Sequence, residues 1–145
     1  MTGKRQMRDN PQAFIDTNIL VYRVYGSFEQ KECVGRILEG LSTPAIISKQ
    51  VLKEFINASI KKKLHKSQEE LKRHLTKTAE SFAVSEITVA TIFEALDLKE
   101  QCHYSFYYSL IIATALENKC GILYSEDLQH EQIIRKKLKI INPFK

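Results

Sequence analysis

The sequence predicts an α/β fold, a single-domain α/β/α sandwich around a short parallel sheet. Short apolar segments typical of buried strands alternate along the chain with longer segments whose apolar residues recur at helical spacing. Strands that alternate with helices connect through right-handed crossovers and therefore lie parallel, with helices covering the sheet. The sequence contains no internal repeat, low-complexity tract or linker, so we expect one domain over residues 1–145.

Four segments have the apolar composition of short strands, and a fifth is a weaker candidate. The four strands are expected at 13–16, 44–48, 81–84 and 122–125, and the weaker candidate covers 139–144. Pro44 stands at the first residue of its strand, where the missing N–H is tolerated.

Six helices are expected between these strands. In the segment 29–41 the apolar residues fall at i, i+3, i+4 and i+7, which is the spacing of one helix face. Ser67 and Glu70 have the spacing of a capping box and open a later helix. The expected helices cover 18–24, 29–41, the segment after Ser48, 67 to about 79, 88–101 and 105–119.

The composition is that of an ordinary soluble globular protein, with 43% hydrophobic and 27% charged residues. The 22 Lys and Arg against 17 Asp and Glu give a net charge of +5, which modestly favours an anionic partner such as nucleic acid. The positive charge gathers in KKKLHK (61–66) and RKKLK (135–139), which suit solvated helix ends as well as RNA-contacting patches.

Neither a membrane-spanning helix nor a secretory leader is predicted. The longest apolar stretches fall far short of the ~20 residues that a spanning helix needs, and the N-terminal segment MTGKRQMRDNPQ is polar. Cys33, Cys102 and Cys120 form no C-x-x-C pair, so we expect buried free thiols in a reducing compartment. The protein is therefore expected to be cytoplasmic.

Acidic residues fall at one edge of the predicted sheet. Asp16 ends the first strand, Glu126 and Asp127 follow the fourth, and Glu54 lies in the first turns of the helix that leaves the second strand. Sites in open parallel sheets form beyond the carboxyl ends of the strands. We therefore expect Asp16, Glu54 and Asp127 to share a cleft.

Each of these acids also has a purely structural role open to it. Asp16 and Asp127 stand where Asp commonly caps a helix, and Glu54 could face solvent. Convergence of three acids favours a site, because two carboxylates about 4 Å apart repel by roughly 4 kcal/mol at an effective dielectric constant of about 20. Such a cluster takes up protons or binds a cation, and oxygen ligands select Mg²⁺ or Mn²⁺.

Other classes of phosphate enzyme lack their motifs in this sequence. No G-x-x-x-x-G-K-[ST] loop and no G-x-G-x-x-G fingerprint occurs, and neither DTN nor SED forms the two-aspartate motif of haloacid dehalogenase-like phosphatases. The four histidines have no zinc-ligand spacing. These observations argue against a nucleotide-binding fold and a zinc site.

Four segments together resemble the motifs of PIN domains, and the closest resemblance is to the small bacterial toxin ribonucleases of the VapC type. The segments are FIDTNILVY, SKQVLKEF, SFYYSLIIATALENKC and LYSEDLQH, and the resemblance runs from about residue 12 to residue 143. It implies a PIN-like α/β sandwich whose acids bind Mg²⁺ or Mn²⁺ and direct water at an RNA phosphodiester.

The resemblance also implies roles for individual residues. Asp16, Glu54 and Asp127 would be the catalytic acids and metal ligands, and Glu126 is a further candidate ligand. The supporting residues would be Asn18, beside Asp16, and Ser125, beside Asp127.

One position departs from the family pattern. In SFYYSLIIA the family usually has Asp where this sequence has Tyr108, three residues after the helix-capping Ser105. A carboxylate in this first helical turn would project toward the cleft, whereas a phenol stays neutral near pH 7. We therefore expect weakened metal binding and impaired cleavage.

The function that the resemblance implies is a metal-dependent endoribonuclease toxin of a toxin–antitoxin module, impaired by Tyr108. The RNA-contact candidates are Lys61, Lys62, Lys63 and Lys66. The resemblance further implies a homodimer and an antitoxin that covers the cleft. The alternative is a catalytically inactive PIN module that binds RNA or an antitoxin without cleavage.

Overall fold

The computed structural model describes residues 11–145 as one mixed sheet surrounded by helices. The strands are β1 (Ala13–Ile15), β2 (Ile46–Ser48), β3 (Ala83–Ser85), β4 (Ile122–Tyr124), β5 (Ile133–Ile134) and β6 (Leu138–Ile141). Their order in the sheet is β3-β2-β1-β4-β6-β5. All neighbours pair in parallel except β5, which runs antiparallel to β6 at the edge.

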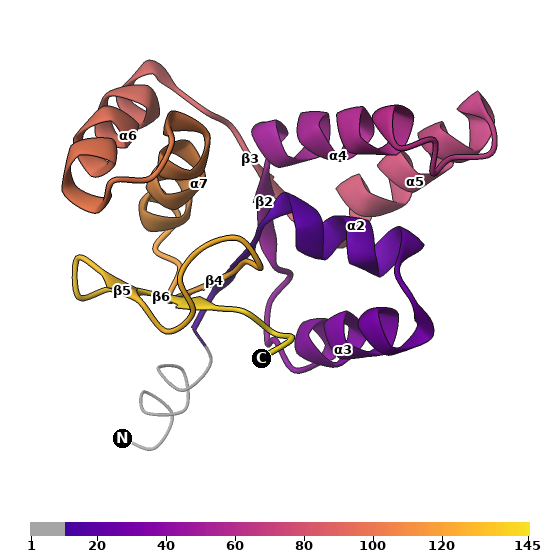
Figure 1. Cartoon of the computed structure of the whole chain (residues 1–145), viewed down its shortest axis with the longest axis horizontal. Helices are drawn as coiled ribbons and strands as arrows, with labels where there is room; N and C mark the ends of the chain where they lie inside the picture. Colours follow the sequence, from indigo (N-terminus) through magenta and orange to yellow (C-terminus); the bar gives the residue numbers. More distant parts are fainter. Residues whose placement is uncertain (1–10) are drawn as a thin grey trace.

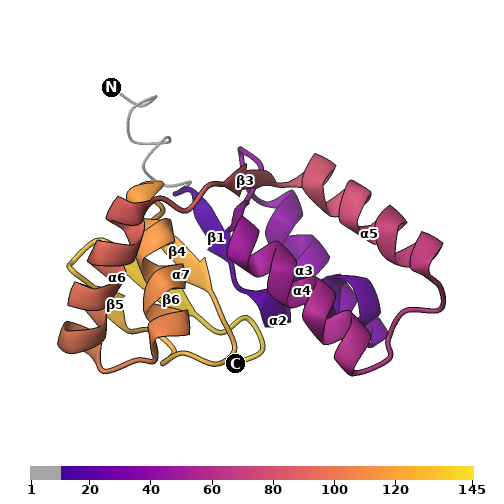
Figure 2. The same cartoon turned by 90° about the horizontal axis from the view of Figure 1, so that it is seen from above.

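Six helices cover this sheet within the described residues. They are α2 (Thr17–Tyr25), α3 (Phe28–Glu39), α4 (Lys49–Lys61), α5 (Gln68–Ser81), α6 (Val89–Cys102) and α7 (Phe106–Glu117). In Figure 1, α6 and α7 lie together on one side of the molecule, and α2 to α5 lie on the other. Figure 2 shows the same two helical groups from above, with β1 between them.

The predicted α/β/α sandwich around a short parallel sheet is confirmed, and the sheet departs from parallel pairing at β5 on one edge. The weaker strand candidate is real and corresponds to β6, whereas β5 was not expected. β5 has only two residues, too few to show the alternation that marks a strand. Arg135 and Lys136 adopt φ angles of 51° and 59° and turn the chain back into β6.

The strand–helix junctions follow from local sequence. Ser48 ends β2, and its hydroxyl accepts a hydrogen bond from the Val51 N–H at 3.2 Å, which caps α4. Ser105 caps α7 in the same way, accepting from the Tyr108 N–H. α7 is apolar nearly all round, and its residues from Ser109 to Ala115 are all buried. These caps fix the residues at which α4 and α7 begin, and therefore the directions of the side chains in their first turns.

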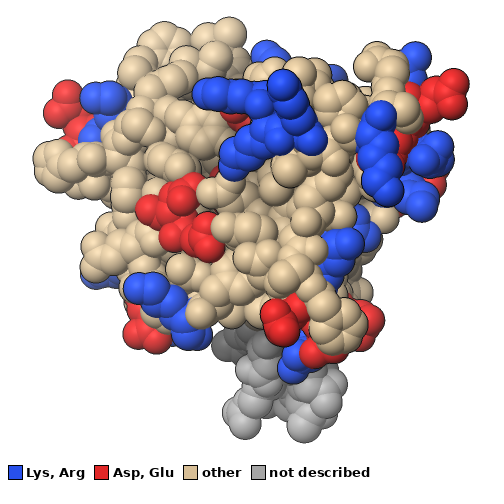
Figure 3. Space-filling view, turned by 45° about the vertical axis from the view of Figure 1, so that its right-hand side comes forward, with Lys and Arg blue, Asp and Glu red and all other residues tan. Residues whose placement is uncertain are grey.

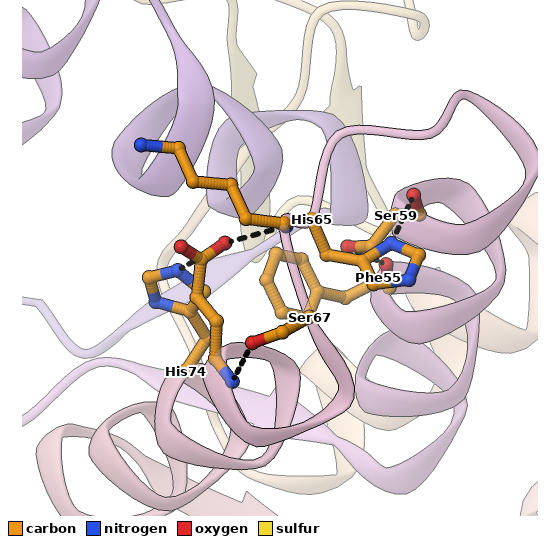
Figure 4. A network of polar contacts seen from close by, with 7 residues as sticks. Phe55, Ser59, His65, Ser67 and His74 are labelled. Atoms are coloured by element: carbon orange, nitrogen blue, oxygen red, sulfur yellow. Dashed lines mark hydrogen bonds and ion pairs between the residues drawn. The ribbon is translucent and has the colours of Figure 1, made fainter.

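The expected capping box of α5 is only half formed. The Ser67 hydroxyl accepts from the Glu70 N–H at 3.1 Å, but the Glu70 carboxylate accepts from the Lys66 N–H instead of from Ser67. The same carboxylate lies 3.7 Å from His74 Nε2. Figure 4 shows this network, which joins the α4–α5 connection to α5. In the same connection His65 Nδ1 lies 3.2 Å from the Ser59 carbonyl oxygen of α4.

Residues 1–10 are outside the described part of the chain, and they include all of the expected polar N-terminal segment except Pro11 and Gln12. Within residues 11–145, no helix has the length and apolar character that crossing a membrane requires. The three cysteines are free, and Cys120 is buried as expected, whereas Cys33 and Cys102 are half-buried.

Replacing Phe55 measures how much the packing of α4 against the core contributes to stability. The Phe55 side chain is completely buried beside Glu54, so Phe55→Ala should lower the free energy of unfolding by about 3–5 kcal/mol. Urea unfolding followed by circular dichroism measures the change. The matched control is Phe28→Ala, because Phe28 is 76% exposed and its loss should cost at most about 0.5 kcal/mol. Equal losses for the two variants would contradict this account of the core.

Candidate active site

A cleft of ≈ 600 Å³ opens between the two helical groups at the carboxyl ends of β1 and β4. Its walls come from α2, α4, α7 and the loop after β4, and it is lined by Asp16, Thr17, Asn18, Glu54, Asn57, Ala58, Ile60, Lys61, Lys62, Tyr107, Tyr108 and Asp127. Figure 3 shows acidic side chains near the middle of one face, with basic side chains directly beside them. The structure therefore brings the predicted acids to one cleft.

Asp16 is the buried carboxylate of this cleft, with 1% of its surface exposed. Its Oδ1 accepts from the Thr17 N–H at 2.7 Å and so caps α2, and its Oδ2 accepts from the Ser125 hydroxyl at 2.8 Å. Burial raises the pKa of Asp16 from 3.8 to about 6, although these two hydrogen bonds oppose the rise. The capping role and the site role, posed above as alternatives, fall on the same side chain.

Asp127 is the exposed carboxylate, and two donors hold it. Its Oδ2 accepts from the Asn18 amide at 2.7 Å and from the Tyr108 hydroxyl at 2.8 Å. Asn18, expected beside Asp16, is therefore bonded to Asp127. The negative charge of Asp127 contributes to the raised pKa of Asp16, which indicates that the two carboxylates are close enough to interact.

Ser125 connects the Asp16 carboxylate to the backbone at Asp127. Its hydroxyl donates to Asp16 and accepts from the backbone N–H of Asp127 at 3.3 Å and of Leu128 at 3.4 Å. The side chain is fully buried, so the hydroxyl has no bulk water to bind in their place. Ser125 thus fixes the loop after β4 against the end of β1.

The remaining predicted residues are less tightly grouped. Glu54 is half-buried in the α4 wall of the cleft. Glu126 lies outside the lining, and its carboxylate accepts from the Tyr22 hydroxyl at 2.7 Å, which raises the pKa of Tyr22 to about 12. Lys61 and Lys62 line the cleft, whereas Lys63 and Lys66 do not.

Tyr108, where the sequence resemblance implies a carboxylate in relatives, lines the cleft and bonds Asp127. Burial and the hydrogen bond to Asp127 raise the pKa of its phenol, so the group stays protonated and donates. Its ring packs edge-on against Tyr107, with centroids 5.0 Å apart. The cleft therefore holds a neutral donor at this position, with one negative charge fewer than a carboxylate would bring.

Sequence reasoning missed Tyr107 and Thr17 as cleft residues. Their hydroxyl oxygens lie 2.8 Å apart in a hydrogen bond between α7 and α2. Burial raises the pKa of Tyr107 to about 12, so its hydroxyl is protonated near neutral pH. The sequence did contain a signal for them, because Thr17 directly follows Asp16 and Tyr107 directly precedes Tyr108, each at the start of a helix.

The donors of the cleft suit a divalent cation held mainly by two carboxylates. Asp16 and Asp127 supply oxygen ligands, and neither takes part in an ion pair among residues 11–145. No three Asp, Glu, His or Cys side chains of that range come close enough to hold a metal together. The residues therefore fit a cation bound by two acids and water.

Comparison with known proteins identifies one family. The PIN domain model matches residues 13–136, a range that contains Asp16, Glu54, Tyr108 and Asp127. None of the curated proteins matches the sequence.

Several solved structures share the fold at low sequence identity. A toxin–antitoxin complex from Klebsiella pneumoniae aligns with a TM-score of 0.70 and 18% identity, over 91% of this chain and 98% of that one. VapC20 of Mycobacterium tuberculosis, a toxin that cleaves the sarcin-ricin loop, aligns with a TM-score of 0.66 and 15% identity, over 80% and 90%. VapBC2 of Rickettsia felis, bound to a promoter DNA fragment, aligns with a TM-score of 0.69 and 18% identity, over 88% and 97%.

The buried charge of Asp16 should make the stability of the protein fall with rising pH. Below pH about 4 the carboxyl is protonated in both the folded and the unfolded state. Above pH about 6 it is ionised in both, and burial disfavours the ionised form in the folded state by about 3 kcal/mol. Asp16→Asn keeps a capping oxygen without the charge and should unfold several degrees higher at pH 8, with the gain lost near pH 4.

Thermal unfolding across this pH range measures the effect. Asp97→Asn is the matched control, because Asp97 is exposed on α6 and its replacement should leave the pH dependence unchanged. If Asp16→Asn were no more stable than the parent protein at pH 8, the buried charge would be fully compensated and the prediction wrong.

Proposed function

The chain belongs to the PIN domain family, and from this premise we propose that it is a metal-dependent endoribonuclease toxin of a toxin–antitoxin module. The observation that carries the proposal is that the buried carboxylate of Asp16 and the exposed carboxylate of Asp127 line one cleft that has lysines in its wall. Ser125 holds them together, because its hydroxyl donates to the Asp16 carboxylate and accepts from the backbone N–H of Asp127. Its domain would comprise the whole chain, with the core over about residues 12–143.

The chemistry would be hydrolysis of an RNA phosphodiester. PIN nucleases generally use divalent metals, and we propose Mg²⁺ or Mn²⁺ at Asp16 and Asp127, where a bound cation lowers the pKa of water and neutralises phosphate charge. Glu54, across the cleft, would orient the attacking water. Glu126 would first have to release the Tyr22 hydroxyl before it could contribute.

The substrate that suits this cleft is RNA. Lys61 and Lys62 lie in the wall formed by α4 and its end, where they would attract phosphates and counter the repulsion from the acids. Lys63 and Lys66 would act outside the cleft as part of the same basic run. One of the similar structures is a toxin that cleaves the sarcin-ricin loop, which supports this substrate class.

We also propose an antitoxin partner, a homodimer and a cytoplasmic location. Several proteins of similar fold were solved as toxin–antitoxin complexes or bound to DNA with their partners, which supports the antitoxin. The homodimer is supported by α6, which exposes Val89, Ile92, Phe93 and Leu96 at the spacing of one helix face. A helix with such an uncovered apolar face suits a self-complementary contact.

Tyr108 is proposed to impair the nuclease. Its hydroxyl already donates to Asp127, and it adds no negative charge to attract a cation. Together with the absence of a three-acid cluster among residues 11–145, this favours a second candidate function. In that alternative the chain is a PIN module that binds RNA or an antitoxin without cutting.

Tyr108→Asp decides between the two functions. A carboxylate at this position should raise Mn²⁺ affinity by about 10-fold or more, because a charged ligand contributes at least ~1.5 kcal/mol. Mn²⁺ titration read by thermal shift, together with cleavage of a structured RNA pool, measures the gain. Tyr108→Phe is the control, since it removes the hydroxyl without adding charge.

The active-site assignment has its own test in the same assay. Adding Asp16→Asn to Tyr108→Asp should abolish both the Mn²⁺ shift and the cleavage. Cleavage that persists without Asp16 would refute the proposed site. If Tyr108→Asp binds Mn²⁺ but still does not cut RNA, the non-catalytic module is the better description.

The proposed dimer is tested by Phe93→Glu. Phe93 is 68% exposed in the middle of the α6 face, so a charge there should convert a dimer to a monomer in light scattering. Phe28→Glu on α3 is the matched control, because its ring is 76% exposed and lies outside that face. A parent protein that is monomeric, or a dimer that tolerates Phe93→Glu, would contradict the assignment of this face.

A further inference from the structure

A second pocket of ≈ 300 Å³ adjoins the acidic cleft at the beginning of α4. It is lined by Lys49, Gln50, Lys53, Glu54, Glu86, Ile87 and Leu110. Glu54 lines both this pocket and the acidic cleft, so the two hollows meet at that side chain. A ligand that passes through the cleft along α4 would therefore reach the second pocket next.

The lining of this pocket suits a flat ring with a polar edge. Ile87 and Leu110 supply apolar surface, and Gln50 supplies an amide. The Gln50 Nε2 donates to the Tyr107 carbonyl at 3.1 Å, which fixes the amide beside the cleft. Its Oε1 is buried and has no hydrogen-bond donor among residues 11–145. A buried acceptor without a donor is costly, so a turn of the Gln50 side chain that brings Oε1 to a donor on a ligand in the pocket would be favoured.

The charges around the pocket suit the phosphates of the same ligand. Lys53 is exposed and takes part in none of the ion pairs of the described residues, whereas Lys49 pairs with Glu86 at 2.8 Å. Both lysines lie at the start of α4, and Lys61 and Lys62 lie at its end. Positive charge thus stands on both sides of Glu54, which is where a nucleic-acid backbone crossing the acidic cleft would need it.

We propose that this pocket is a base-binding subsite for the nucleotide next to the one at the acidic cleft. Single-stranded RNA would lie along α4, with Lys53 at a phosphate and an unstacked base between Ile87 and Leu110. The Gln50 Oε1 would accept from the exocyclic amino group of adenine or cytosine. Uracil would be disfavoured, because its one donor on this edge, N3–H, lies between two carbonyl oxygens that would repel the amide oxygen. The inference rests on the proposed function, because it assigns a further part of the same RNA-binding surface.

An acidic peptide is the other polymer that exposed lysines could attract, and the pocket suits it less well. Glu54 and Glu86 both line the pocket and would repel carboxylates. Phosphates would be repelled too, but a base placed in the pocket keeps its own phosphates at the mouth, beside Lys53. The apolar walls and the amide have no counterpart in a chain of acidic side chains.

The test is binding of RNA without cleavage. Fluorescence anisotropy in EDTA, at several salt concentrations, would compare short labelled homopolymers of adenosine, cytidine and uridine. The parent protein should bind adenosine and cytidine polymers about 10-fold more tightly than uridine, the effect of one net hydrogen bond of ~1.4 kcal/mol. Gln50→Leu should remove this preference and leave uridine binding unchanged.

Lys53→Glu provides a second variant on an exposed position that does not threaten folding. It should weaken binding of all three polymers about 10-fold and lower the slope of log affinity against log salt by about 1. Lys31→Glu is the matched control, because Lys31 is exposed on α3 and lines neither hollow. It changes the net charge equally and should have a much smaller effect.

Three outcomes would overturn the subsite. Equal losses of RNA affinity in Lys53→Glu and Lys31→Glu would show that Lys53 acts only through the net charge of the protein. A base preference that survives Gln50→Leu would show that the Gln50 amide does not recognise the base. Competition by poly-L-glutamate as strong as that by RNA would assign the lysines to an acidic polypeptide. Failure of the parent protein to bind any of the polymers, even at low salt, would instead refute the proposed RNA-directed function together with the subsite.

Discussion

The structure of the cleft depends on one buried carboxylate. Asp16 is removed from water, and its two oxygens accept from the Thr17 N–H and the Ser125 hydroxyl, which belong to segments far apart in the sequence. These bonds start α2, fix the loop after β4 and place Asp127 at the rim. An ionised carboxylate at this depth is destabilising by itself, so the fold retains a charge that a purely structural cap would not need.

Charge in the cleft is divided between two walls. Asp16 and Asp127 form the acidic side, and α4 with its end supplies lysines on the other side. A phosphodiester placed between them would meet attraction from one wall and need a cation to approach the other. Tyr108 shifts this balance, because its neutral hydroxyl occupies an acceptor of Asp127 where a carboxylate would have added negative charge.

α4 connects the two hollows of this face. Glu54 projects from its middle, and the buried Phe55 anchors the helix in the core directly beside that carboxylate. The network around Glu70 and His74 holds α5 against the connection that follows α4 (Figure 4). The helix is therefore anchored to the core at its middle and carries lysines near both of its ends.

The sequence by itself determined the layered fold, most element positions and the identity of the acids, because apolar periodicity, caps and strand ends are local properties. It did not reveal β5, whose two residues carry no period, nor that Asn18 and Tyr108 both bond Asp127 across 109 and 19 residues of chain. It also left open whether Asp16 caps a helix or serves a site. Only the tertiary structure decided this question: Asp16 caps α2, and it does so inside a cleft that suits a cation. Burial and distance could not be read from the sequence, because they arise when separate segments pack together.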